Sequence, residues 1–296
     1  MDLDRVILGT NPLNGISHFS GSKAREKLGT LNNERVIQVI DASLSTGATG
    51  INLSPSTRLF SILNTMKKEG YARRFGVYLM LPDMERFRSA MLTGGTIAVA
   101  KELLSNLGWT DLLAVAAKGG LSMLLSDYSK LLQEYLELEC RRLYSVLPRG
   151  GQLRCMLAHE QLTDLAIGLN ADGVLKQFVA HAMKMGIMPG FVTRNFPLFV
   201  GFLSECGIDP AKLVIMTPFN SVGFQMTPDK GTCERLLSGS KSRIIGISTL
   251  AGGMLSLDAA TNYLKTLSAL RSVVVGVSSV EHATETMPKM LNALTA

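Results

Sequence analysis

The chain of 296 residues is 46% hydrophobic and 18% charged, which is the balance of a globular protein and not of a disordered one. Its 30 Lys and Arg residues exceed its 24 Asp and Glu residues, but they are scattered, so the clustered basic stripe of a nucleic-acid-binding surface is missing. The most apolar stretch, residues 109–125, contains Asp111 and Lys118 and is too interrupted to span a membrane.

Short apolar runs alternate with stretches of helical period from the N-terminus onward. In the first half of the chain this pattern predicts strands at residues 6–9, 50–53 and 75–81 and helices at 33–46 and 57–69. Asn32 or Asn33 can cap the first helix, and Gly47 can end it. A third helix is predicted at 128–147, where a Pro-Arg-Gly-Gly sequence closes it.

The second half continues the alternation. We predict strands at residues 153–158, 189–193, 213–216, 244–248 and 273–277, and helices at 172–184, 197–206 and 280–294. Eight strand–helix units in succession, without a linker or an internal repeat, predict a single domain over residues 1–296. The expected fold is an α/β, eight-stranded (β/α)8 (TIM) barrel, whose functional residues lie in the loops after the strands.

Residues 82–127 do not fit a simple strand–helix unit. Apolar stretches broken by Gly94–Gly95, Gly108 and Gly119–Gly120 predict a helical insertion after the third strand, at the carboxyl ends of the strands. Its apolar content needs burial against the barrel or another subunit. The insertion is therefore predicted either to cover the functional end or to form a homo-oligomer interface.

Four segments of the second half resemble the aldo-keto reductases. Residues 246–255 (GISTLAGGML) are similar to that family's element after strand seven, and residues 275–286 (VGVSSVEHATET) to its element after strand eight. Thr193–Phe196 stands where the family has Ser-Asn-Phe, and Leu157–His159 resembles its Leu-x-His of strand four. The resemblance implies a TIM barrel that binds NADP(H).

The loops after strands seven and eight are also suited to anion binding for reasons that do not depend on the resemblance. Small residues permit close approach of the backbone, and helix N-termini present free N–H groups. A phosphate or cofactor is therefore predicted to bind at Ser248, Gly252, Gly253, Ser278 and Ser279. The alternative is that the two final serines only cap the last helix and that the glycines only turn the chain.

The catalytic residues that the resemblance implies are mostly absent. Asn52 replaces the family's Asp, the Tyr position falls near Thr57, and residues 75–81 contain no Lys. Ile247 replaces the aromatic residue that stacks on the nicotinamide, and residues 278–286 contain no Lys or Arg to pair a 2′-phosphate. We therefore expect NADP(H) binding to be weak or absent. Of that machinery only His159 remains.

The candidate site is assembled from polar residues at the predicted strand ends. The catalytic candidates are His159, His18 and Asn52, and the substrate-binding candidates are Asn11, Asn14, Arg58, Arg194, Asn195 and Asn220. A metal site would need His18, His159 and Glu160, but adjacent strand residues point to opposite faces, so we predict no metal.

Four cysteines without a Cys-x-x-Cys pair are typical of reduced thiols, and the acidic N-terminus predicts no signal peptide, so we expect a cytoplasmic protein. The leading hypothesis is a divergent aldo-keto-reductase-like enzyme acting on a small oxygenated, perhaps phosphorylated, substrate with His159 as acid or base. Two alternatives stay open: a non-redox lyase or isomerase, possibly metal-assisted, and a non-catalytic ligand sensor.

Overall fold

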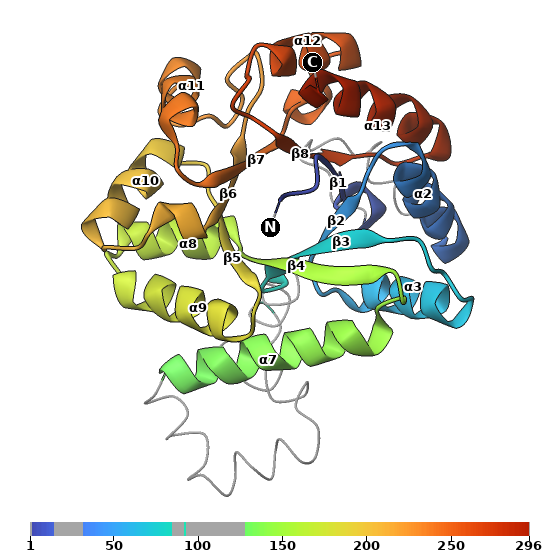
Figure 1. The fold of residues 1–296 in the computed structure, drawn as a ribbon, viewed down its shortest axis with the longest axis horizontal. Coiled ribbons are helices and arrows are strands. Elements are labelled where there is room, and N and C mark those ends of the chain that lie inside the picture. Colours follow the sequence, from blue (N-terminus) through green and yellow to red (C-terminus); the bar gives the residue numbers. More distant parts are fainter. Residues whose placement is uncertain (1, 15–31, 85–91, 93–127, 296) are drawn as a thin grey trace, which may run out of the picture.

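Eight parallel strands pair in the order of the sequence, and the last pairs with the first to close a barrel (Figure 1). The structure is a computed structural model that describes residues 2–14, 32–84, 92 and 128–295. The strands are β1 (Val6–Gly9), β2 (Gly50–Leu53), β3 (Phe75–Leu81), β4 (Gly151–Ala158), β5 (Met188–Val192), β6 (Val214–Pro218), β7 (Arg243–Ile247) and β8 (Ser272–Gly276). The predicted (β/α)8 barrel is confirmed.

Helices cover the outside of the barrel (Figure 1). They are α2 (Asn33–Thr46), α3 (Thr57–Lys68), α7 (Tyr128–Val146), α8 (Glu160–Gly168), α9 (Asp172–Lys184), α10 (Phe196–Glu205), α11 (Lys230–Gly239), α12 (Leu257–Lys265) and α13 (Val280–Thr295). No described helix is long and apolar enough to cross a bilayer. Most of the predicted insertion, residues 85–91 and 93–127, lies outside the described residues, and so does His18.

Three described helices, α8, α11 and α12, have no counterpart among the predicted helices, and α8 is the one that bears on the site. The sequence pattern left residues 159–171 as a connection between β4 and the next helix, whereas residues 160–168 are helical. Only Thr163 and Ala166 of this helix are buried, so it lacks the broad apolar stripe on which a prediction depends. His159, which begins it, is also not one of the common capping residues.

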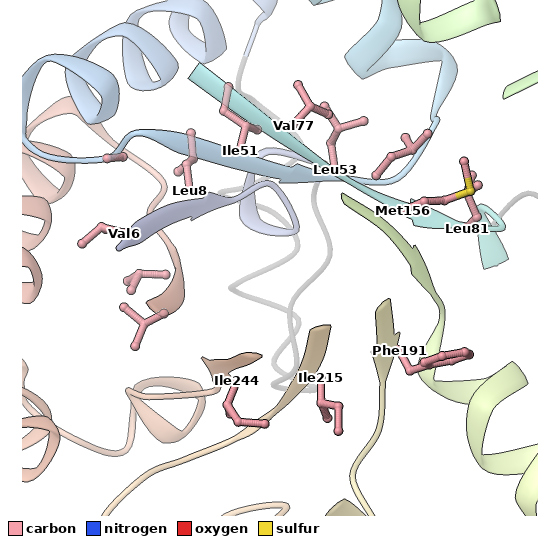
Figure 2. Close-up of a cluster of buried hydrophobic side chains, with 14 of the residues drawn as sticks. Val6, Leu8, Ile51, Leu53, Val77, Leu81, Met156, Phe191, Ile215 and Ile244 are labelled. Carbon is pink, nitrogen blue, oxygen red and sulfur yellow. The ribbon is translucent and has the colours of Figure 1, made fainter. Parts of the chain in front are cut away.

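Strand residues alternate between two hydrophobic layers. One row faces the inside of the barrel and includes Tyr78, Cys155, Leu157, Val192 and Met216. The other faces the helices, as Figure 2 shows for residues such as Val6, Ile51, Met156 and Phe191. Continuous apolar strands are expected when both faces of a parallel sheet are covered.

A polar network fills the lower end of the barrel, where the strands begin. The Tyr78 hydroxyl donates to Asp4 Oδ2 at 2.9 Å and accepts from the Asp4 backbone N–H at 2.9 Å. Arg154 Nη1 lies 3.3 Å from the same carboxylate oxygen, and the Ser272 hydroxyl donates to the Asp4 carbonyl. A Cβ at Gly76 would stand 2.7 Å from Arg154 Cδ, so glycine leaves the room this network needs.

Candidate active site at the upper end of the barrel

The carboxyl ends of the parallel strands meet at the other, upper end of the barrel, as the fold requires. Every described residue of the predicted site lies at or just after one of these ends: Asn11 and Asn14 after β1, Asn52 in the last half of β2 and Arg58 after it, His159 after β4, Arg194 and Asn195 after β5, Asn220 after β6, Ser248, Gly252 and Gly253 after β7, and Ser278 and Ser279 after β8. The topology therefore brings these residues to one end of the molecule.

His159 continues the row of side chains that faces the inside of the barrel. Cys155 and Leu157 lie in that row, and the backbone of His159 is still extended, with φ −61° and ψ 146°. Since extended residues alternate between faces, the imidazole lies on the side of the barrel mouth. Arg194 follows Val192 of β5 by the same two-residue step.

The environment of His159 favours one protonation state and one tautomer of its ring. Nδ1 accepts a hydrogen bond from the Gln161 backbone N–H at 3.2 Å, which caps α8 and requires that Nδ1 carry no proton. Burial lowers the pKa of His159 below its ordinary value of 6.5; Glu160 opposes this shift, Arg194 adds to it and Asp83 opposes it. At neutral pH the ring is therefore uncharged, and its proton is on Nε2. Nε2 has no hydrogen-bond partner among the described residues.

A bidentate ion pair lies beside the imidazole of His159. Arg194 Nη2 lies 2.6 Å from Glu160 Oε1, and Arg194 Nε lies 3.0 Å from Glu160 Oε2. The side chains are 33% and 22% exposed, so the pair is partly shielded from water. It links the first residue of α8 to the loop after β5, and this geometry fixes the guanidinium more firmly than a single contact would.

A second carboxylate joins the same two segments. The Thr193 hydroxyl donates to Asp164 Oδ1 at 2.6 Å and accepts from the Asn195 backbone N–H at 3.0 Å. Burial raises the pKa of Asp164, and the hydrogen bond from Thr193 opposes that shift. Thr193 is fully buried, so these bonds hold the start of α10 against α8.

Asn52 is 9% exposed, and its amide Nδ2 donates to the Tyr78 carbonyl on β3 at 3.0 Å. The Thr10 hydroxyl and backbone N–H both bond to the Asn52 carbonyl. These contacts fix Asn52 at the end of β2. A neutral amide here cannot supply the negative charge that a carboxylate would.

The loops after β6 and β7 contain strained non-glycine residues. Gln225 and Ser248 have φ values of 60° and 53°, and their side chains meet at 3.4 Å. Such conformations cost about 1–3 kcal/mol each and occur often at functional sites. Asn220 is fully buried, and its carboxamide bonds to both backbone groups of Phe224, so this side chain shapes the loop after β6.

The start of α13 already holds a negative charge. The Ser279 hydroxyl accepts from the His282 backbone N–H, as the capping alternative predicts. Bonds from its own N–H and from Ser279 lower the pKa of Glu281, which is therefore ionised. A carboxylate at this helix N-terminus competes with a phosphate for the same N–H groups.

Two features of this end differ from what NADP(H) binding, as the resemblance implies it, would require. The partly buried Ile247 offers no aromatic face, and the carboxylate at the start of α13 is that of the exposed Glu281. Among the described residues no three His, Cys, Asp or Glu side chains gather closely enough to hold a metal ion, and His18, which the metal alternative requires, lies outside those residues.

Comparisons with known proteins give structural matches only. No family model matches the chain, and no curated protein matches it. A Pseudomonas aeruginosa protein described as an aldo-keto reductase superimposes with a TM-score of 0.60 at 14% identity, covering 99% of this chain and 96% of its own. The fold is that of the aldo-keto reductases.

Two further structures extend the likeness. A glycerol dehydrogenase of Gluconobacter oxydans matches with a TM-score of 0.54 at 12% identity, over 98% of this chain and 87% of its own. An aldo-keto reductase of Klebsiella pneumoniae in complex with NADPH matches with a TM-score of 0.51 at 11% identity, over 96% of this chain and 84% of its own. At such identities the aldo-keto reductase likeness establishes the fold and not the reaction.

The sequence reasoning missed three contributors to this end of the barrel: Asp164, Thr193 and Gln225. Thr193 had a usable signal, because it is a hydroxyl at the end of a buried strand. Asp164 lies in α8, one of the helices that were not predicted. Gln225 is distinguished only by its left-handed backbone, which the residue type does not reveal.

Proposed function

We propose that this chain is an aldo-keto-reductase-like enzyme of altered chemistry that binds a small oxygenated substrate at the mouth of the barrel. In this proposal neutral His159 donates a hydrogen bond from Nε2–H to the substrate's carbonyl oxygen. The single observation that carries it is the bond from the Gln161 N–H to Nδ1, which leaves the proton on Nε2. A neutral imidazole can polarise a carbonyl and stabilise the charge that develops on its oxygen.

The misfit to NADP(H) favours proton transfer over hydride transfer. Polarising a carbonyl acidifies the neighbouring C–H bond, and transfer of that proton to water or to a carboxylate of the site, Glu160 or Asp164, needs no nicotinamide. The observations that favour this class are the aliphatic Ile247 where a nicotinamide would stack and the lack of Lys and Arg in residues 278–286.

The test is a screen of D-glyceraldehyde and dihydroxyacetone in D2O, followed by proton NMR, with and without NADPH. We expect exchange of the hydrogens beside the carbonyl, or conversion, without nicotinamide. The His159→Asn variant should lose this activity, because asparagine retains the helix cap but lacks the outer N–H donor. Conversion that requires NADPH, or a His159→Asn variant as active as the parent, would contradict the proposal.

A phosphorylated substrate is a finer version of the same proposal. The loop after β7 supports it, because Ser248, Ala251, Gly252 and Gly253 have left-handed backbones that turn the chain tightly. We expect D-glyceraldehyde 3-phosphate to be preferred to D-glyceraldehyde, and Ser248→Ala to reduce that preference. Equal kcat/KM values for the two compounds would exclude a phosphate site.

A further inference from the structure

Exposed basic residues lie directly before the strands, at the lower end of the barrel. They are scattered in the sequence, but eight parallel strands in a closed barrel bring the residues before each strand to one end (Figure 1). Each of the following precedes a different strand by one or two residues: Arg5, Arg74, Arg149, Lys212, Lys241 and Arg271. We call this set the basic face.

Backbone hydrogen bonds join the turns that carry the basic face. The bonds are Val273 N–H to the Arg5 carbonyl, Phe75 N–H to the Gly150 carbonyl and Arg243 N–H to the Leu213 carbonyl. They connect the start of β8 to that of β1, the start of β3 to that of β4, and the start of β7 to that of β6. The basic residues therefore lie as neighbouring pairs around one continuous end of the barrel.

Most of the charge of the basic face is not neutralised. Among the described residues, no ion pair involves the side chain of Arg5, Arg74, Arg149, Lys241 or Arg271. Lys212 lies 3.9 Å from Asp209, but a pair this exposed contributes little. The exposed acidic residues at this end are fewer: Asp2, Glu69, Glu205 and Asp209. The helix dipole favours lysines in a last helical turn, such as Lys68 and Lys184, but it does not account for basic residues beside the strands.

A flat anionic surface fits the basic face better than a nucleic acid does. The charges surround the end of the barrel, whereas a nucleic acid binds along a stripe or groove. Tyr144 and Met183, near the ends of α7 and α9, are 52% and 45% exposed at the same end. Lys67 Nζ donates to the Ser145 carbonyl at 2.7 Å, which places a positive charge beside Tyr144. Spread positive charge with amphipathic side chains among it is typical of a surface that contacts lipid headgroups.

We infer that the basic face docks this protein on a membrane surface that carries anionic phospholipids. Each basic residue held near such a bilayer strengthens binding about fivefold. The contact is made at the headgroups and needs no spanning helix. The opposite end of the barrel, with His159, then faces away from the bilayer and stays open to a substrate. This inference does not depend on the reaction proposed above.

Co-sedimentation of the full chain with lipid vesicles tests the inference. We expect binding to phosphatidylcholine vesicles that contain about 30% phosphatidylserine at about 0.1 M salt, and loss of binding at about 0.5 M salt. The double variant Arg74→Glu, Arg149→Glu should lower the partition coefficient at least about 30-fold. The matched control is Arg35→Glu, Lys230→Glu, which changes the net charge equally but lies at the upper end, in the first turns of α2 and α11. It should bind as the parent does. A thermal melt checks that each variant is folded.

Lysine acetylation of the parent, with and without these vesicles, covers the case in which the double variant fails to fold. Lys68 and Lys241 should be protected by the vesicles, whereas Lys230 should not. Three results would overturn the inference: no binding to the anionic vesicles, equal binding to pure phosphatidylcholine vesicles, or an equal loss of binding in the two folded double variants. Tighter binding of a single-stranded RNA oligonucleotide than of the vesicles would also overturn it, and would assign the basic face to nucleic acid.

Discussion

Asp4 and Tyr78 satisfy each other's polar groups at the lower end of the barrel, whereas at the upper end His159 keeps Nε2 without a partner among the described residues. Both ends place polar side chains inside an apolar barrel. At the lower end Asp4, Tyr78 and Ser272 are bonded to one another and packed against glycines, although the buried Nε of Arg154 has no hydrogen-bond partner among the described residues. At the upper end the Nε2–H donor of His159 is oriented and has no partner among the described residues. Incomplete bonding alone therefore does not mark a functional site; what distinguishes the upper end is that the donor lies at the carboxyl ends of the strands, where a substrate can reach it.

The largest predicted difference between the two ends of the barrel is in catalysis. His159→Asn is expected to lower kcat/KM for the substrate found in the D2O screen by about 10²–10³, the effect of removing one donor to a developing oxyanion. The melting temperature should stay near that of the parent, because asparagine still caps α8. Steady-state rates and a thermal melt measure both quantities. A large drop in melting temperature with unchanged kcat/KM would give His159 a structural role instead.

A second prediction concerns the nicotinamide cofactor at the upper end. Losing two charge-assisted hydrogen bonds of about 1.5–3 kcal/mol each should weaken NADPH binding by roughly two to four orders of magnitude relative to a true reductase. Isothermal titration calorimetry measures the dissociation constant directly. Glu281→Gln is a useful companion, because removing the carboxylate from the start of α13 should tighten whatever binding occurs. A submicromolar dissociation constant for the parent would restore the reductase hypothesis.

At the lower end the effect should be on stability alone. Tyr78→Phe removes the hydroxyl that bonds to the Asp4 carboxylate and N–H, which should lower the free energy of unfolding by about 1–3 kcal/mol. Urea denaturation measures this change, and the kcat/KM value serves as the control. Unchanged stability together with lost activity would mean that the two ends are not separate in function.

The smallest effect should be on the pH dependence of activity, where two substitutions should shift the acid limb in opposite directions. Protonation of His159 removes the lone pair on Nδ1 that caps α8, so activity should be full above its lowered pKa and fall as the pH drops through it. Glu160→Gln should move this acid limb to lower pH, because the carboxylate favours the charged ring. Arg194→Met should move it to higher pH. Shifts in the same direction would show that another group controls the limb.

The barrel itself could be predicted because its pattern is repeated and locally consistent. The bounds of α2 and α9 agree with the predicted helices, since each has a periodic apolar face and a clear stop at Gly47 or Gly186. The position of the site was also predictable, because the carboxyl ends of all strands in a parallel barrel lie at one end, whatever conformations the loops adopt. Asn52, His159 and Arg194 were placed on that basis.

The bonding at each site was not predictable, because it depends on contacts between distant segments. The Glu160–Arg194 pair spans 34 positions, and the Asp4–Tyr78 bond spans 74. The sequence marks Glu281 only as a residue near a helix start. The bonds it makes with Ser279 and its own N–H, which lower the pKa of its carboxyl, appear only in the structure.

Nitrogen-15 NMR of the His159 ring tests the central claim most directly, with His159→Asn used to assign the signal. Our account predicts a neutral ring at pH 7 with the proton on Nε2, a pKa below 6.5, and a shift of the Nε2 signal when a substrate from the screen binds. A proton on Nδ1, or a ring that is charged at pH 7, would contradict it.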